Sequence, residues 1–124
     1  MGVYYVKRYI VQRNSLEVPV NADLSDLGRF SDPSLLILAS LAGGAKHGYA
    51  MIEDIESLAG VRLGPGTLYG ALARLEQRGL IAPLPSDDRR RPYRLTERGA
   101  ASLQGQLLTL ERFAAVGLER LSAL

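Results

Sequence analysis

Apolar positions recur at helical spacing in three consecutive stretches between residues 33 and 78. In the first stretch, 33–42, they fall at i, i+3, i+4 and i+7, the spacing of one buried helix face. Ser31 or Asp32 can cap this helix, Pro33 suits its first turn, and the glycines at 43 and 44 can end it. The residues expected to form its buried stripe are Leu35, Leu38, Ala39 and Ala42.

Two further helices are expected, the second from Gly48 and the third over Pro65 to Arg78. On a helical wheel of roughly 100 degrees per residue, Leu68, Leu72 and Leu75 form the core side of the third helix. Its outer face carries Gly66, Gly70, Ala73, Arg74 and Gln77, and the buried face of the second helix is expected to carry Tyr49, Ile52, Ile55 and Ala59.

A short hairpin and a long helix complete the pattern. Segments 80–84 and 92–96 are typical of strands around a polar tip, and Pro83 restricts its strand to an edge or a short length. Thr96 is a suitable cap for a last helix that runs nearly to Leu124. The prediction is a mainly α fold in which residues 32–96 form three helices and a hairpin, 97–124 a helix, and 1–31 an N-terminal extension or arm with no assigned function.

The outer face of the third helix is nearly bare of side chains, so its backbone can approach a surface as closely as a DNA major groove requires. Arg74 and Gln77 would then project toward base edges, while Thr67, Tyr69 and Arg78 on the flanks would reach phosphate oxygens. The alternative is a plain amphipathic surface helix.

Charge is concentrated rather than abundant. The net charge is +2, but residues 66–95 hold six arginines against three acids, a local balance of 6 − 3 = +3. Arginine suits forked contacts to phosphate, although its excess over lysine is equally typical of a GC-rich genome. A solvated turn is the alternative for the hairpin tip, where Asp87 and Asp88 offset the arginines. Helix and hairpin together favour binding to double-stranded DNA, through Arg89, Arg90, Arg91 and Arg94 of the hairpin.

Composition restricts the other function classes. A chain of 124 residues with 47% hydrophobic and 23% charged residues indicates one soluble domain without a membrane span. The first apolar segment is too short for a secretory signal, so a cytoplasmic location is expected. With no cysteine, thiolate metal sites are excluded. The single histidine, His47, lacks the partners of a metal site or a catalytic base, so we expect a structural role, no metal, no cofactor and no enzymatic activity.

The last helix has a heptad seam over its whole length, which predicts a helix partner. Packing onto its own domain is the alternative, and we expect both, because so short a chain has little core to cover so wide a stripe. In a homodimer, the third helix of each subunit would face one of two DNA half-sites, which lie about one helical turn apart. The expected dimerisation residues are Leu103, Leu107, Leu110, Phe113, Ala114, Gly117 and Leu121.

Four motifs in residues 35–99 resemble the PadR-type regulators. They are LLILASLAGG, HGYAMIEDI, GPGTLYGALARLEQRGLI and RRPYRLTERG. The resemblance implies a winged helix-turn-helix fold in which the third motif is the recognition helix, with Thr67, Leu68 and Tyr69 at its start and Leu72, Arg74, Leu75 and Glu76 in its body. Gly70 replaces a proline that is common in the family, which loosens that turn or allows closer approach to DNA.

The resemblance further implies a bacterial repressor that dimerises through its C-terminal helix. Some relatives accept a small-molecule effector near that interface, but this sequence identifies no effector. From another class, the rival is a winged-helix protein-interaction module that has lost DNA binding, in which the tyrosine-rich N-terminal arm and the last helix recruit a partner.

Overall fold

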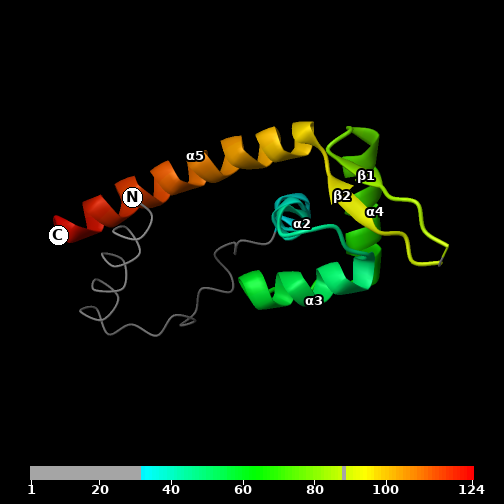
Figure 1. The fold of residues 1–124 in the computed structure, drawn as a ribbon. Helices are drawn as coiled ribbons and strands as arrows, with labels where there is room; N and C mark the ends of the chain where they lie inside the picture. The colour runs from blue at the N-terminus through cyan, green and yellow to red at the C-terminus, as the bar shows by residue number, and fades with distance from the viewer. Residues whose placement is uncertain (1–31, 88) are drawn as a thin grey trace. The chain divides into compact units, whose positions relative to one another are not determined.

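The elements follow the chain in the predicted order of three helices, hairpin and long helix. The computed structural model describes residues 32–87 and 89–124, so the predicted N-terminal extension lies outside the described residues. The elements are α2 (Pro33–Ala42), α3 (Gly48–Ala59), α4 (Pro65–Gln77), β1 (Ile81–Pro83), β2 (Tyr93–Leu95) and α5 (Glu97–Ser122) (Figure 1). The expected mainly α fold with a winged helix-turn-helix is confirmed. No helix in the described part of the chain is long and apolar enough to cross a membrane.

The helices begin and end at capping residues, prolines and glycines that can be recognised in the sequence. The Asp32 side chain accepts a hydrogen bond from the Ser34 N–H at 3.0 Å, and Pro33 occupies the first turn of α2. Gly60 ends α3 in the left-handed conformation with φ 69°, and Gly79 follows α4 with φ 73°. Glycine adopts this backbone without a steric penalty, so the chain turns sharply at both points.

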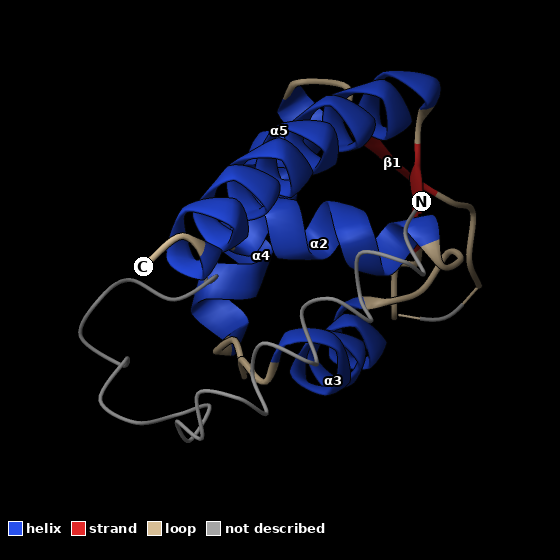
Figure 2. Ribbon diagram, turned by 90° about the vertical axis from the view of Figure 1, so that its left-hand side faces the viewer, coloured by secondary structure: helices blue, strands red, loops and turns tan. Residues whose placement is uncertain are grey.

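Helix α2 lies at the centre of the unit formed by residues 32–107 and contacts α3, α4 and β2 (Figure 2). Its predicted one-sided stripe is wrong in part, because Ala42 is exposed. A helix enclosed by neighbours buries more than one face. Its buried residues are Leu35, Leu36, Ile37, Leu38, Ser40 and Leu41.

The buried face of α3 is rotated from the predicted one. Tyr49, expected in the core, is 59% exposed, and Ala59 is half-buried. The observed stripe starts one residue earlier and follows the i, i+3, i+4, i+7 spacing, which the predicted one did not. Its first residue, Gly48, packs against side chains of α4. The stripe consists of Gly48, Met51, Ile52 and Ile55.

The wing is an antiparallel hairpin in which Ile81 pairs with Leu95 and Pro83 with Tyr93. The regular strands are the middle of the predicted segments. On its other side β2 exchanges two hydrogen bonds with Lys46, at 3.2 and 3.1 Å between N and O. Pro83 therefore stands on an edge strand, as expected for a residue without an N–H.

The start of α5 is locked onto the hairpin. The Thr96 hydroxyl donates to Gly79 O at 2.7 Å and accepts from Gly99 N–H at 3.0 Å, so the predicted cap is confirmed. Gly99 is required by contact, because a Cβ there would lie 2.0 Å from Leu80 O. One turn later Leu103 is buried, 6% exposed. Leu103, one of the predicted dimerisation residues, is thus covered within its own chain.

Candidate nucleic-acid interface

Helix α4 has two contrasting faces. Leu68, Ala71, Leu72 and Leu75 are buried, which fixes the helix on its core side. The structure places all the α4 residues predicted to contact DNA outside that core. Gly70 is half-buried, and the exposed ones are Gly66, Thr67, Tyr69, Ala73, Arg74, Gln77 and Arg78.

The small residues of the outer face leave space rather than fill it. A Cβ on Gly66 would meet nothing within 4 Å, and a Cβ on Gly70 would meet only the Arg74 guanidinium, at 3.6 Å. The Arg74 side chain therefore lies back over Gly70, one turn earlier in the helix. The outer face of α4 therefore has few protruding side chains, and the Arg74 guanidinium is the cation that lies on it.

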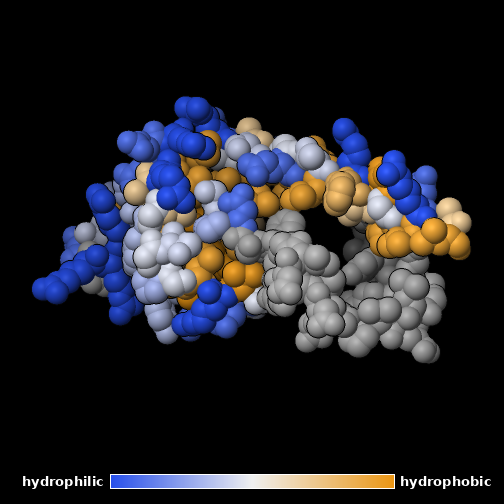
Figure 3. Space-filling model, turned by 180° about the vertical axis from the view of Figure 1, so that it is seen from behind, coloured by the Kyte–Doolittle hydropathy of each residue, from blue (hydrophilic) through white to orange (hydrophobic). Residues whose placement is uncertain are grey.

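The wing loop carries exposed cations on the hairpin that follows α4. Arg89, Arg90, Arg91 and Arg94 are all exposed, and hydrophilic side chains project from the wing loop at the left of Figure 3. Ion pairs among residues 32–87 and 89–124 join Lys46 to Asp54 and Arg62 to Glu56, and none involves Arg74 or a wing arginine. The Glu56 carboxylate, 2.7 Å from Arg62, raises the pKa of that guanidinium, so Arg62 differs from the wing arginines in having an acidic partner.

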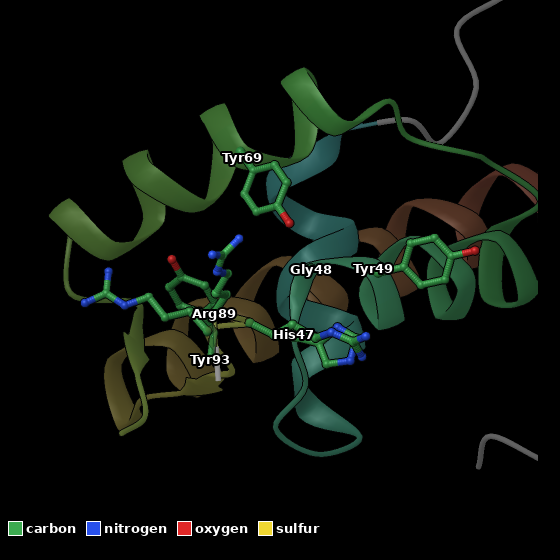
Figure 4. A pocket seen from close by; sticks show the side chains of 8 residues that line it. His47, Gly48, Tyr49, Tyr69, Arg89 and Tyr93 are labelled. Carbon is green, nitrogen blue, oxygen red and sulfur yellow. The ribbon is translucent and has the colours of Figure 1, made fainter. Parts of the chain in front are cut away.

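An open cleft of about 680 Å³ lies between the start of α3, α4 and the wing (Figure 4). It unites Tyr69 with three of the predicted wing arginines, whereas Arg74, Gln77, Arg78 and Arg94 lie outside it. None of the described residues that line it is acidic, so it favours an anion. The lining residues are His47, Gly48, Tyr49, Tyr69, Arg89, Arg90, Arg91 and Tyr93.

Sequence reasoning did not place His47, Gly48, Tyr49 or Tyr93 in a site, although the HGY and RRPYRL motifs marked them as unusual. The structural role expected for His47 is observed, because its Nδ1 accepts a hydrogen bond from the Ala50 N–H at 3.4 Å and caps α3. Tyr93 is nearly buried in β2 and forms the floor of the cleft beside Arg89 in Figure 4.

A partly buried polar network positions α3 against α2 and the wing. The buried Ser40 hydroxyl of α2 donates to Asp54 Oδ2 of α3 at 2.6 Å. Lys46, which pairs with β2, lies 3.6 Å from the same carboxylate and also donates to Ser40 O. Because a buried polar group needs a partner, this network joins the middle of α3 to α2 and to Lys46, the residue that pairs with β2.

The C-terminal part of the chain, residues 108–124, which contains the second half of α5, exposes large apolar side chains. Phe113 is 76% exposed, and hydrophobic side chains lie open to view toward the C-terminal end of the helix in Figure 3. Of the predicted dimerisation residues, Leu110 is half-buried, and those that are exposed are Leu107, Phe113, Ala114, Gly117 and Leu121.

Comparison with known proteins gives two informative curated relatives. The chain is 45% identical over 86 residues to an uncharacterized 37.1 kDa protein in transposon TN4556 of Streptomyces fradiae, covering 69% of this chain and 25% of that protein. It is 33% identical over 102 residues to the transcriptional activator GvpE2 of Halobacterium salinarum, covering 78% of this chain and 50% of the relative. The chain therefore spans about a quarter of the length of the first curated relative and about half of the length of the second.

Among solved structures, a PadR family transcription regulator from hypervirulent Clostridium difficile superposes with a TM-score of 0.65 at 26% identity, covering 72% of this chain and 97% of that one. The model of the transcriptional regulator PadR-like family matches residues 37–105, which run from α2 into α5 and make up more than half of the chain. The chain therefore belongs to the PadR-like family, whose members are transcriptional regulators and not enzymes.

Proposed function

We propose that this protein is a sequence-specific DNA-binding transcriptional regulator that acts as a homodimer. In each subunit α4 enters the major groove and the wing lies on the sugar-phosphate backbone. The observation that carries the proposal is the contrast between the two faces of α4. Its apolar face is buried, whereas its outer face is exposed and has mostly small side chains, and the wing with its arginines comes next in the chain.

The two basic regions have different tasks in this proposal. Arg74 and Gln77 stand on the groove-facing side of α4 and read base edges, for which arginine and glutamine have the donors. The wing arginines neutralise phosphates and release counterions, which gives affinity without sequence preference. The exposed wing and the open face of α4 support this division.

The homodimer is supported by the apolar side chains that residues 108–124 leave exposed. Isolated exposed leucines are common, but a stripe of this length on one helix is typical of an interface. Its heptad spacing suits a second copy of the same helix. The seam begins at Leu107, which is 44% exposed, because Leu103 is covered within its own chain.

We further propose that the protein represses transcription in the cytoplasm, by occupying an operator. The family supports regulation but not its sign, since the relative GvpE2 is named an activator. A reporter fused to the promoter upstream of this gene decides between the two, because deletion of the regulator raises expression if it is a repressor and lowers it if it is an activator.

The test of DNA binding is a mobility-shift titration of the full chain against that promoter at two salt concentrations. We expect Arg74→Ala to relax base preference, with a loss of about 1–3 kcal/mol at one position of each half-site. Arg90→Ala is expected to weaken binding to all sequences and to lower the salt slope by about 1. Arg120→Ala, near the end of α5, removes the same charge outside the proposed DNA interface and serves as the control.

Equal losses on all sequences for Arg74→Ala and Arg90→Ala would refute the division between α4 and the wing. Absence of binding by the unmodified chain at low salt would favour the rival, a winged-helix module that uses the exposed face of α5 to bind another protein.

A further inference from the structure

Tyr69 of α4 rests on the first residue of α3. A Cβ on Gly48 would lie 2.7 Å from the Tyr69 hydroxyl oxygen, 3.0 Å from its Cζ and 3.1 Å from Leu68 Cδ2. Figure 4 shows the Tyr69 side chain reaching from α4 toward Gly48, whereas the neighbouring Tyr49 points away from α4. Only glycine leaves the space that the phenol end of Tyr69 occupies.

This contact lies where the buried start of α3 meets the edge of the basic cleft. Tyr69 remains 55% exposed and lines the same cleft as Arg89, Arg90 and Arg91 of the wing. A phenol hydroxyl can donate one hydrogen bond to a phosphate oxygen, and guanidinium groups bind the same oxygens with charge. The cleft thus combines a neutral donor, the Tyr69 hydroxyl, with exposed cations.

We infer that Gly48 is a positioning residue for DNA, which sets the Tyr69 hydroxyl beside the wing arginines so that both contact one backbone phosphate. The inference rests on the proposed function and deepens it. It assigns a role in the interface to α3, an element outside the predicted reading surface. It also gives Tyr69 a different role from Arg74 and Gln77: Tyr69 contacts phosphate, which carries no base preference, and the other two read bases.

The inference makes Gly48 more important for binding than for folding. An added methyl meets the far end of the Tyr69 side chain, which can swing away into solvent, and presses on Leu68 at a distance that needs a shift of a few tenths of an ångström. We therefore expect the melting temperature of Gly48→Ala to stay within about 5 °C of the unmodified protein. Gly43→Ala is the matched control, since the Cβ there would meet Ser40 O at an acceptable 3.4 Å.

The experiment combines affinity with a map of phosphate contacts. Titration of promoter duplex and of unrelated duplex is expected to give about threefold to tenfold weaker binding for Tyr69→Phe on both, the value of one hydrogen bond. Gly48→Ala should lose at least as much, and Gly48→Ala combined with Tyr69→Ala should bind no worse than Tyr69→Ala alone. Ethylation interference should show one phosphate per half-site whose ethylation impairs Tyr69→Phe and Gly48→Ala less than the unmodified protein, because the wing arginines still contact it.

Additive losses in the double variant, or an unchanged ethylation pattern for Tyr69→Phe, overturn the inference while leaving the proposed function standing. Unfolding of Gly48→Ala even in the Tyr69→Ala background also overturns it, because Gly48 then serves packing against Leu68. Failure of the unmodified protein to bind either duplex overturns the proposed function together with the inference.

Discussion

Two helices of this protein are rich in apolar residues, and they use them in opposite ways. Six of the ten residues of α2 are buried within the unit formed by residues 32–107. The part of α5 beyond Leu107 instead exposes Leu108, Phe113 and Leu121. The difference teaches that periodicity reveals an apolar face but does not say whether the covering partner is in the same chain.

The length of each apolar pattern explains the difference. Helix α2 spans ten residues and is short enough to be enclosed by α3, α4 and β2, with which it is in contact. Helix α5 spans 26 residues and buries only Gly99 and Leu103, both in its first third. The rest of its stripe requires a partner from outside the unit or remains in contact with water.

The largest expected effect comes from the centre of the unit. Leu38→Ala removes a side chain that is 1% exposed, so we expect a loss of about 2–5 kcal/mol in the free energy of unfolding. Leu58→Ala, at a position of α3 that is 59% exposed, is the same chemical change and should cost less than about 0.5 kcal/mol. Urea titration followed by circular dichroism measures both, and equal losses would contradict a core centred on α2.

A second substitution tests where along α5 the packing against the core ends. Gly99→Ala places a Cβ 2.0 Å from Leu80 O, a backbone atom that cannot move aside, and should lower the free energy of unfolding by about 2 kcal/mol or more. Gly105→Ala, two turns later, meets nothing within 4 Å and should stabilise the helix by up to about 1 kcal/mol. Thermal melts that show the same sign for both variants would refute this boundary.

Local chemistry made much of the fold predictable. The Asp32 and Thr96 caps, the edge position of Pro83 and the two faces of α4 depend on residues close together in the chain. The rotation of α3 was missed because the predicted stripe began at Tyr49, whose i+4 and i+7 positions are glutamates. Gly48 has apolar residues at i+3, i+4 and i+7, and it contacts Tyr69 of α4.

The candidate site was predictable where it depends on one element and unpredictable where it joins several. The outer face of α4 and the wing arginines came from periodicity and charge. The cleft required knowing that His47 and Tyr93 lie beside Tyr69, and the network of Ser40 with Asp54 joins residues 14 positions apart. No periodic pattern records such pairings, because they are set by packing between elements.

A smaller loss is expected from that network. Ser40→Ala removes the hydroxyl that donates to Asp54 Oδ2 at 2.6 Å and leaves the carboxylate with Lys46 alone. We expect a loss of about 1–2 kcal/mol in the free energy of unfolding, since the hydrogen bond has a charged acceptor. Ser57→Ala on the exposed side of α3 is the control, and chemical denaturation of the two variants side by side is the measurement. An unchanged denaturation midpoint for Ser40→Ala would show that water replaces the hydroxyl.

The smallest expected effect on unfolding of the unit is the one that sharpens the contrast between α2 and α5. Phe113 is 76% exposed, so Phe113→Ala should leave unfolding of residues 32–107 within about 0.5 kcal/mol at protein concentrations where the chain is monomeric. The same change should raise the dissociation constant of the proposed homodimer at least about tenfold, since aromatic side chains dominate interfaces of this kind. Sedimentation velocity across a concentration series measures the dimer, with Glu111→Ala as the exposed control on the same helix. An unaltered dimer together with a clear loss of unfolding free energy would mean that Phe113 is covered by its own chain, and α5 would then resemble α2 after all.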